Sequence, residues 1–521
     1  MSVLEQRLST APESPAVAEK PAKNTYGQIL KSSALIGSSS VLNVGFGIVR
    51  TKAMALLLGP MGVGLLGDYT AISDLVRTLA GMGVNTSGVR QIAEAAGTGD
   101  TQHLARTVIA LRRVAVWSGA LGALLLLIFC KPISRLTFMD DHHAGAVALL
   151  AIAVFFGDVS AGQGALVQGM RRIADLAKMS VLGAFYGTLF SIPIVYFYRE
   201  QGVVPSLVCV AGMGILTSWW YARKVKVEPL PMKMGEVAKE ASALLRMGVV
   251  FMVSTLMTMG VACLIRIIIT RKFGIEGAGL YQSAWALGGL YIGFVLQAMG
   301  ADFYPRLTAA AKNNPECNRL VNEQAEIGLL LAGPGVIGTL TFAPLVISLF
   351  YTAKFGPAVE TFRWICLGMV LRVASWPMGF ILLAKGERKL FFWSELVSNL
   401  VYVGLVWGGI HKFGLEGAGM AFFGLYVFYW VGIYMVVRRL SGFRWSQANR
   451  RLALLFVPTT AAVFAAWYVL PYWQGLILGG VATAICGIYS LRTLCSLIPL
   501  ARLPQAARKL LTLFRLAPAG N

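Results

Sequence analysis

Lone arginines lie within or at the ends of long apolar stretches of this chain, where a charge is costly. They are Arg50, Arg77, Arg266 and Arg372. An arginine near the middle of a membrane span costs about 2.5–3.5 kcal/mol on insertion scales, so it usually faces a protein interior or a water-filled cavity. Guanidinium groups bind phosphate oxygens in pairs and stay charged when partly desolvated. The pattern therefore predicts a binding site for an anionic group inside a membrane.

Each arginine also has a structural interpretation. Asp74 and Arg77 have the i,i+3 spacing of one helix face and could neutralise each other, which is the preferred interpretation of Asp74. Arg50 and Arg266 could instead extend to the outer membrane interface. Arg372 has no acid within one turn, which favours a role in binding.

Polar residues accompany the arginines inside the apolar stretches. Asp68, Asp74 and Asp158 could relay protons, bind a sodium ion or pair with an arginine. Asp158 lies in the polar stripe Gly157-Asp158-Val159-Ser160-Ala161-Gly162-Gln163, which suits the lining of a cavity. Gln163 could bind a sugar, or it could join two helices by a hydrogen bond, which is the commoner role.

The elements that position these residues are membrane helices. Hydrophobic residues make up 56% of the 521 positions and charged residues only 13%. Windows of sufficient length and apolarity predict an all-α polytopic membrane protein with about fourteen transmembrane helices. Both termini then lie on one side, and the excess of lysine and arginine in the loops of that side predicts that it is cytoplasmic. This bias also explains the net charge of +22 without nucleic-acid binding.

A glycine-rich segment recurs along the chain. It reads Leu58-Gly59-Pro60-Met61-Gly62-Val63-Gly64, Phe273-Gly274-Ile275-Glu276-Gly277-Ala278-Gly279 and Phe413-Gly414-Leu415-Glu416-Gly417-Ala418-Gly419. Such spacing permits a tight turn and close helix approach. The first two copies each follow the first span of a half, which predicts two six-helix lobes in parallel repeat around a central cavity, plus two extra C-terminal helices.

The repeat also suggests how the chain is divided. The predicted segments are a disordered cytoplasmic tail (1–24), an N-terminal lobe (25–222), a cytoplasmic linker (223–244), a C-terminal lobe (245–440), an additional helix pair (441–498) and a basic amphipathic cytoplasmic tail (499–521).

Motifs for other chemistry are missing from the sequence. The seven cysteines have no CxxC spacing, and the pair His142-His143 lacks a third ligand, so we expect no metal site and no cofactor. Without a nucleophile–base spacing or a phosphate-binding loop, we expect no catalytic residues and no enzyme activity.

Several of these segments resemble the Wzx-type O-antigen and polysaccharide flippases of the multidrug/oligosaccharidyl-lipid/polysaccharide exporter superfamily. The segments are Gly59 to Gly64, Leu264 to Gly274, and Lys354-Phe355 through Phe362 and Trp364 to Arg372 and Ala384-Lys385. By this resemblance Arg50, Arg77 and Arg372 match basic positions of spans one, two and ten. Ile265 and Met61 stand where related sequences often carry acids.

The resemblance implies a bacterial inner-membrane protein that moves an undecaprenyl-pyrophosphate-linked oligosaccharide, such as an O-antigen, exopolysaccharide or capsule unit, to the periplasmic leaflet. Its partners would be this lipid-linked oligosaccharide, membrane lipids, and a polysaccharide polymerase or glycosyltransferases. The alternatives are a lipid II flippase, a cation-coupled multidrug or metabolite antiporter of the same superfamily, and a non-transporting scaffold. The antiporter is disfavoured because residues 33–53 and 245–270 contain no acid.

Overall fold

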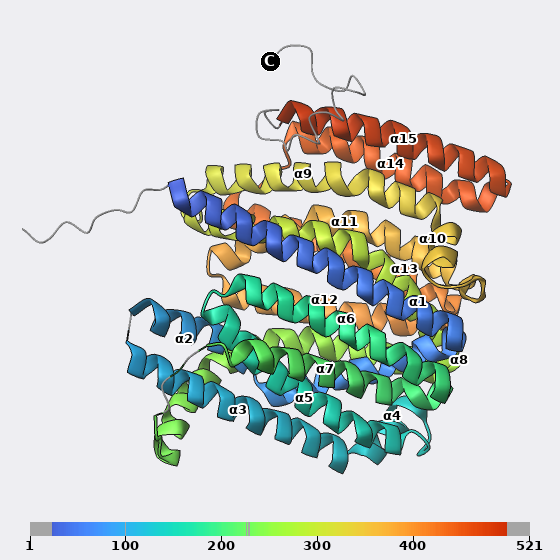
Figure 1. Ribbon diagram of the computed structural model, residues 1–521. Helices are drawn as coiled ribbons and strands as arrows, with labels where there is room; N and C mark the ends of the chain where they lie inside the picture. Colours follow the sequence, from blue (N-terminus) through green and yellow to red (C-terminus); the bar gives the residue numbers. More distant parts are fainter. Residues whose placement is uncertain (1–22, 99, 226, 228–229, 498–521) are drawn as a thin grey trace, which may run out of the picture.

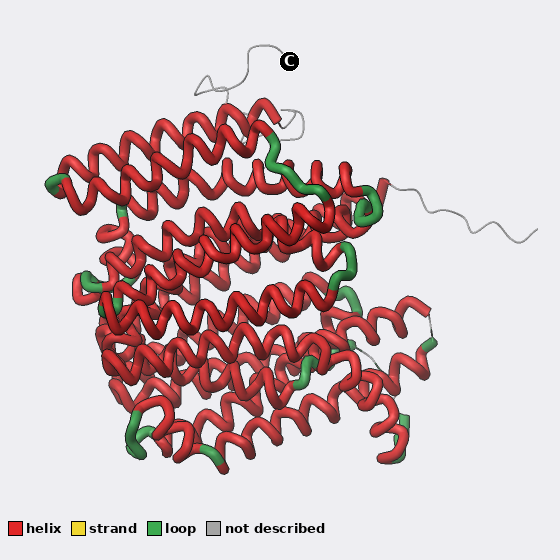
Figure 2. Tube along the Cα trace, turned by 180° about the vertical axis from the view of Figure 1, so that it is seen from behind, coloured by secondary structure: helices red, strands yellow, loops and turns green. Residues whose placement is uncertain are grey.

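The computed structural model describes residues 23–98, 100–225, 227 and 230–497. Within these residues every regular element is a helix, and the long helices lie side by side in one bundle (Figures 1 and 2). The expected all-α fold is confirmed. The predicted tails, 1–24 and 499–521, fall outside the described residues except for residues 23 and 24.

The first half of the chain forms the N-half of the bundle, which we define as α1 to α7. Its elements are α1 (Lys23–Gly81), α2 (Val84–Thr98), α3 (Thr101–Ile128), α4 (Cys130–Phe138), α5 (Ala144–Gly169), α6 (Ile173–Tyr198), the 3-10 helix η1 (Arg199–Gly202) and α7 (Val203–Ala222).

The C-half consists of α8 to α13, and two further helices follow it. The elements are α8 (Met234–Ala309), α9 (Asn314–Thr341), α10 (Ala343–Phe350), the 3-10 helix η2 (Ala353–Phe355), α11 (Ala358–Ala384), α12 (Arg388–Phe413), α13 (Glu416–Ser441), α14 (Gln447–Val469) and α15 (Tyr472–Leu497). Most predicted limits lie within several residues of these helix ends, but α8 begins at Met234, inside the predicted linker 223–244. The division into domains stays a prediction.

The two longest helices are each broken at a repeated glycine. Gly59 has φ 67° and ψ −158° inside α1, and Gly274 has φ 71° and ψ 179° inside α8. Residues with a side chain rarely adopt such positive φ, which explains glycine at both sites. With 59 and 76 residues, α1 and α8 are far longer than one crossing needs, and the chain turns back at each kink (Figure 1). We call the segments before and after each kink the first and second arms.

The helices have the length and composition of membrane spans. Among the described residues, nine helices qualify, or ten if the bent pair α9 and α10 counts as one span. Two of the nine, Ser38–Gly81 with 44 residues and Ile173–Ala222 with 50, are about twice the length that one crossing needs. A multi-pass membrane protein is therefore confirmed, and the count of about fourteen stays a prediction.

The last two helices pack on the C-half through α9 (Figure 1). Gly333 of α9 leaves room for the Phe456 ring of α14, and Gly479 of α15 leaves room for Thr341 of α9. Arg363 of α11 holds α14 as well, since its buried guanidinium lies 4.2 Å from the Trp467 ring centre. The pair α14–α15 is thus an attachment to the C-half.

Candidate functional site

The two halves meet along a seam, where the second arm of α1 packs against both arms of α8. A Cβ atom added to Gly64 would overlap the carbonyl oxygen of Ile275, next to the kinks. At the far end of the seam, a Cβ atom on Gly83 would overlap the carbonyl oxygen of Gly248. The backbones therefore touch at both ends of the seam, which only glycine permits.

Between these two contacts the seam widens into a cavity of about 350 Å³. We call it the seam cavity. The N-half provides mostly polar side chains, and α8 provides two methionines and a threonine. The lining residues are Asp74, Arg77, Thr78 and Gly81 of α1, Gly83 between α1 and α2, Asn85 and Thr86 of α2, Asp158 of α5, and Met252, Thr255 and Met259 of α8.

Arg77 is the cation of the seam cavity, and α5 fixes its position. Its Nε donates to Asp158 Oδ1 at 3.2 Å, and its Nη2 donates to the Gly157 carbonyl at 3.0 Å. Glycine is required at position 157, because a Cβ atom there would lie 2.8 Å from Arg77 Cζ. The Asp158 side chain is only 3% exposed, whereas that of Arg77 is 35% exposed. The buried acid thus holds a guanidinium that still faces the cavity.

The ion pair expected between Asp74 and Arg77 is not formed. Arg77 reaches across to α5, where Gly157 leaves space for its guanidinium, and its ion pair is with Asp158. Asp74 lines the same cavity one turn away. The predicted cavity lining by Asp158 agrees with this geometry.

Arg266 and Asp68 form a second pair across the seam, between the kinks and the cavity. Arg266 Nη1 lies 3.8 Å from Asp68 Oδ1, with side chains 13% and 0% exposed. Asp68 Oδ2 also accepts a hydrogen bond from Thr270 at 2.9 Å, and Arg266 donates to Gln282. Gly67 leaves the space that the guanidinium fills. Arg266 therefore ties the halves together, and this pairing disfavours the alternative in which it extends to the membrane interface.

The other predicted site residues lie away from the seam cavity. Arg50 is half-buried on the first arm of α1, and its Nε makes no hydrogen bond. Arg372 lies inside the C-half, with Nη1 4.0 Å from Met369 Sδ and its Cζ 5.9 Å from the Tyr426 ring centre. Gln163 accepts from Ser218 at 2.6 Å and joins α5 to α7. Of the four lone arginines, Arg77 alone lines this cavity within the described chain.

Sequence reasoning missed the polar start of α2. Asn85 and Thr86 line the seam cavity because the chain breaks at Gly83, where φ is 66°, and α2 starts again beside Arg77. The segment Gly81-Met82-Gly83, with two polar residues one position further on, was the available signal.

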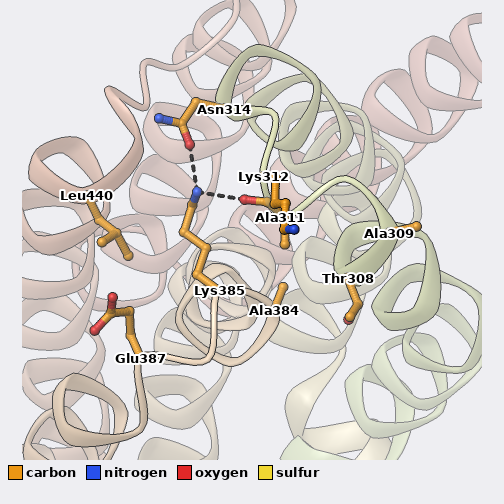
Figure 3. A pocket seen from close by; sticks show the side chains of 9 residues that line it. All are labelled: Thr308, Ala309, Ala311, Lys312, Asn314, Ala384, Lys385, Glu387 and Leu440. Atoms are coloured by element: carbon orange, nitrogen blue, oxygen red, sulfur yellow. Dashed lines mark hydrogen bonds between the residues drawn. The ribbon is translucent and has the colours of Figure 1, made fainter.

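A second, larger cavity of about 540 Å³ lies where the α8–α9 and α11–α12 connections meet (Figure 3). Lys385 crosses it and donates to the Ala311 carbonyl at 2.8 Å and to Asn314 Oδ1 at 2.6 Å. Its ammonium is thus engaged in holding two connections together. The seam cavity is the better candidate despite its smaller volume, because both halves form its walls and its arginine keeps a free face.

Within the described part of the chain, no group of three or more histidine, cysteine, aspartate or glutamate side chains could hold a metal ion.

Comparison with known proteins gives relatives of one kind. The lipid III flippase of Escherichia coli (strain K12) is 21% identical over 422 residues, which span 79% of this chain and 99% of that protein. The lipid III flippase of Shigella flexneri matches with the same figures.

Solved structures with a similar fold include several transporters. Lipid II flippase MurJ in its inward closed conformation has a TM-score of 0.66 at 12% identity, covering 88% of this chain and 99% of that chain. An inward-facing multidrug resistance MATE family transporter of the MOP superfamily has a TM-score of 0.59 at 18% identity, covering 77% and 94%. These matches confirm the expected two-lobed transporter fold.

The sequence also matches the family described as polysaccharide biosynthesis protein over residues 53–360, which is more than half of the chain. The resemblance expected from the glycine-rich turns and the basic positions is thereby confirmed. This chain belongs to the polysaccharide biosynthesis protein family.

Proposed function

We propose that the protein is a flippase that moves a polyprenyl-pyrophosphate-linked oligosaccharide between the leaflets of the bacterial inner membrane by alternating access. One observation carries this proposal: the seam between the halves forms an open polar cavity whose cation, Arg77, is held by a buried acid and left partly exposed. A charged, hydroxyl-rich headgroup cannot cross hydrocarbon unaided, whereas its polyprenyl tail can stay in the bilayer.

The cavity residues suit the parts of such a headgroup. Arg77 Nη1 makes no hydrogen bond within the described residues and can donate to a pyrophosphate oxygen. Thr78, Asn85 and Thr86 offer hydroxyl and amide groups to sugar hydroxyls. The volume of about 350 Å³ is near the lower end for ligand sites, so the halves must part further to admit several sugars.

The relatives support the class of cargo, because both are lipid III flippases by name. The orientation follows the lysine and arginine bias, with both termini cytoplasmic. A polymerase or glycosyltransferase that supplies or consumes the cargo is the expected partner. The lipid II flippase stays a second candidate because MurJ shares the fold over 99% of its length.

The test replaces Arg77 in a strain whose surface glycan depends on this protein. Arg77→Ala strands Asp158 and could unfold the protein, so Arg77→Lys is the sharper variant: it keeps the charge beside Asp158 but loses the planar pair of donors. We expect surface glycan to fall about tenfold or more with Arg77→Lys, at normal protein level, since a lost charged hydrogen bond is worth about 1.5–3 kcal/mol. Arg90→Lys is the matched control, because Arg90 is exposed on α2 and pairs with Glu94.

Two results would reject the proposal. The first is normal glycan display with Arg77→Lys. The second is mass spectrometry of the purified protein that finds no polyprenyl-linked glycan among its bound lipids. Complementation of a strain depleted of its lipid II flippase would show that the second candidate is correct.

A further inference from the structure

The kinks of α1 and α8 lie at one end of the bundle, together with the short helices α4 and α10 (Figure 1). We call this end the kink face. At this face, two basic side chains, one from each half, bind the opposite half. Neither side chain has a role in the proposed function described above.

Lys52 crosses from the N-half to the C-half. It lies on the first arm of α1, and its Nζ donates to the carbonyls of Ser348 at 3.0 Å, Leu349 at 2.9 Å and Tyr351. These carbonyls are at the end of α10, where a helix has no internal donors left and its dipole is negative. All three ammonium hydrogens of Lys52 are thus used across the boundary between the halves.

Arg271 makes the reverse crossing. It lies on the first arm of α8 in the C-half, and its Nε donates to the Leu136 carbonyl at 2.7 Å, with Nη2 3.4 Å from the Arg135 carbonyl. Both carbonyls belong to the last turn of α4 in the N-half. In each half, therefore, a basic side chain on the first long helix binds the C-terminal end of the short helix in the other half.

The short helices that accept the two cations have matching places in the chain order of the two halves. A single residue, Phe129 or Phe342, separates the preceding long helix from α4 or α10. The close approach of two glycines to the opposite backbone near the kinks, which we call the glycine crossing, is reciprocal in the same way. Gly64 meets the Ile275 carbonyl, and Gly279 meets the Pro60 carbonyl.

We infer that Lys52 and Arg271 are a pair of crossed latches that hold the kink face closed and must both release when the halves separate there. Separation at this face parts the first arm of α1 from α10 and the first arm of α8 from α4. Separation at the Gly83–Gly248 end leaves both latches in place. The inference rests on the alternating movement in the proposed function but not on the cargo, because latch release can be measured without transport.

The test uses a buried reporter on the seam. Ser283 follows Gly279 by one turn of α8, is 0% exposed and bonds only to the Leu280 carbonyl of its own helix. We place Ser283→Cys in a full-length chain whose seven cysteines are replaced, and measure labelling by a membrane-impermeant maleimide in whole cells. Lys52→Met together with Arg271→Met should raise the labelling rate about tenfold or more, given the usual strength of a cation at a helix end.

Matched variants separate latch loss from unfolding. Lys272→Met removes an exposed charge beside Arg271 that makes no hydrogen bond within the described chain, and it should label like the parent. Lys52→Arg with Arg271→Lys keeps both donors and should also label slowly. The inference is overturned if the double methionine variant labels at the parent's rate, or if Lys272→Met labels as fast. Failure of the Arg77 proposal would instead appear as normal glycan display with unchanged latch behaviour.

Discussion

The Asp68–Arg266 pair offers a direct measure of how strongly the seam joins the halves. At a separation of 3.8 Å, the two charges attract by about 4 kcal/mol at an effective dielectric constant of about 20. Desolvation offsets much of this attraction, so the intact pair contributes little net stability. Removing one partner, however, leaves a buried charge alone and costs about 3–5 kcal/mol.

A double-mutant cycle isolates this effect. Asp68→Asn keeps an acceptor for Thr270 but strands the guanidinium of Arg266, whereas Arg266→Met strands the carboxylate. We expect either single variant to lower the thermal unfolding midpoint of the purified protein, and the double variant to recover most of that loss. The coupling energy should then be at least as large as the loss in one single variant, about 3–5 kcal/mol. Thr270→Val is the control, since it removes one hydrogen bond from Asp68 but no charge, and it should cost about 1.5–3 kcal/mol and leave the Asp68–Arg266 pair intact.

Additive losses would refute this reasoning. If the double variant unfolds at the temperature expected from summing the singles, the two side chains do not share one charge interaction. The seam would then be held by backbone contacts and apolar packing.

Two further substitutions test the placement of the arginines. Gly157→Ala puts a Cβ atom 2.8 Å from Arg77 Cζ and should displace the guanidinium, so we expect surface glycan to fall as with Arg77→Lys. Gly145→Ala on the same helix meets nothing within 4 Å and should leave immunoblots of surface glycan unchanged. Arg372→Ala should abolish surface glycan while protein level stays normal, and full display in that variant would contradict a binding role inside the C-half.

Local features of the fold could be predicted because they depend on residues close together in the chain. The glycine repeat predicted turns, and positive φ occurs at Gly59, Gly274 and Gly414 in its three copies. Apolar windows of sufficient length predicted the helices for the same reason. The polar stripe around Asp158 predicted a cavity wall because lipid contact would leave its carboxylate without a partner.

Partners of the charged residues could not be predicted, because they depend on how helices pack. Arg77 pairs with an acid 81 positions away in the chain, although Asp74 is only one turn away. Asp68 bonds to Thr270, which is 202 positions away and in the other half. Spacing within one helix gives no information on such contacts. Glycines that admit a side chain from elsewhere, such as Gly67 and Gly157, also cannot be identified without the fold.

The glycine crossing near the kinks has a consequence for the ion gradients of the cell. Because Gly64 and Gly279 leave no room for even a methyl group between the two backbones, a file of water molecules cannot pass between them. Protons and sodium ions then have no wet route between these two backbones. Glycine at these two positions therefore keeps ions from leaking through the crossing, and replacing either glycine by alanine would weaken this barrier.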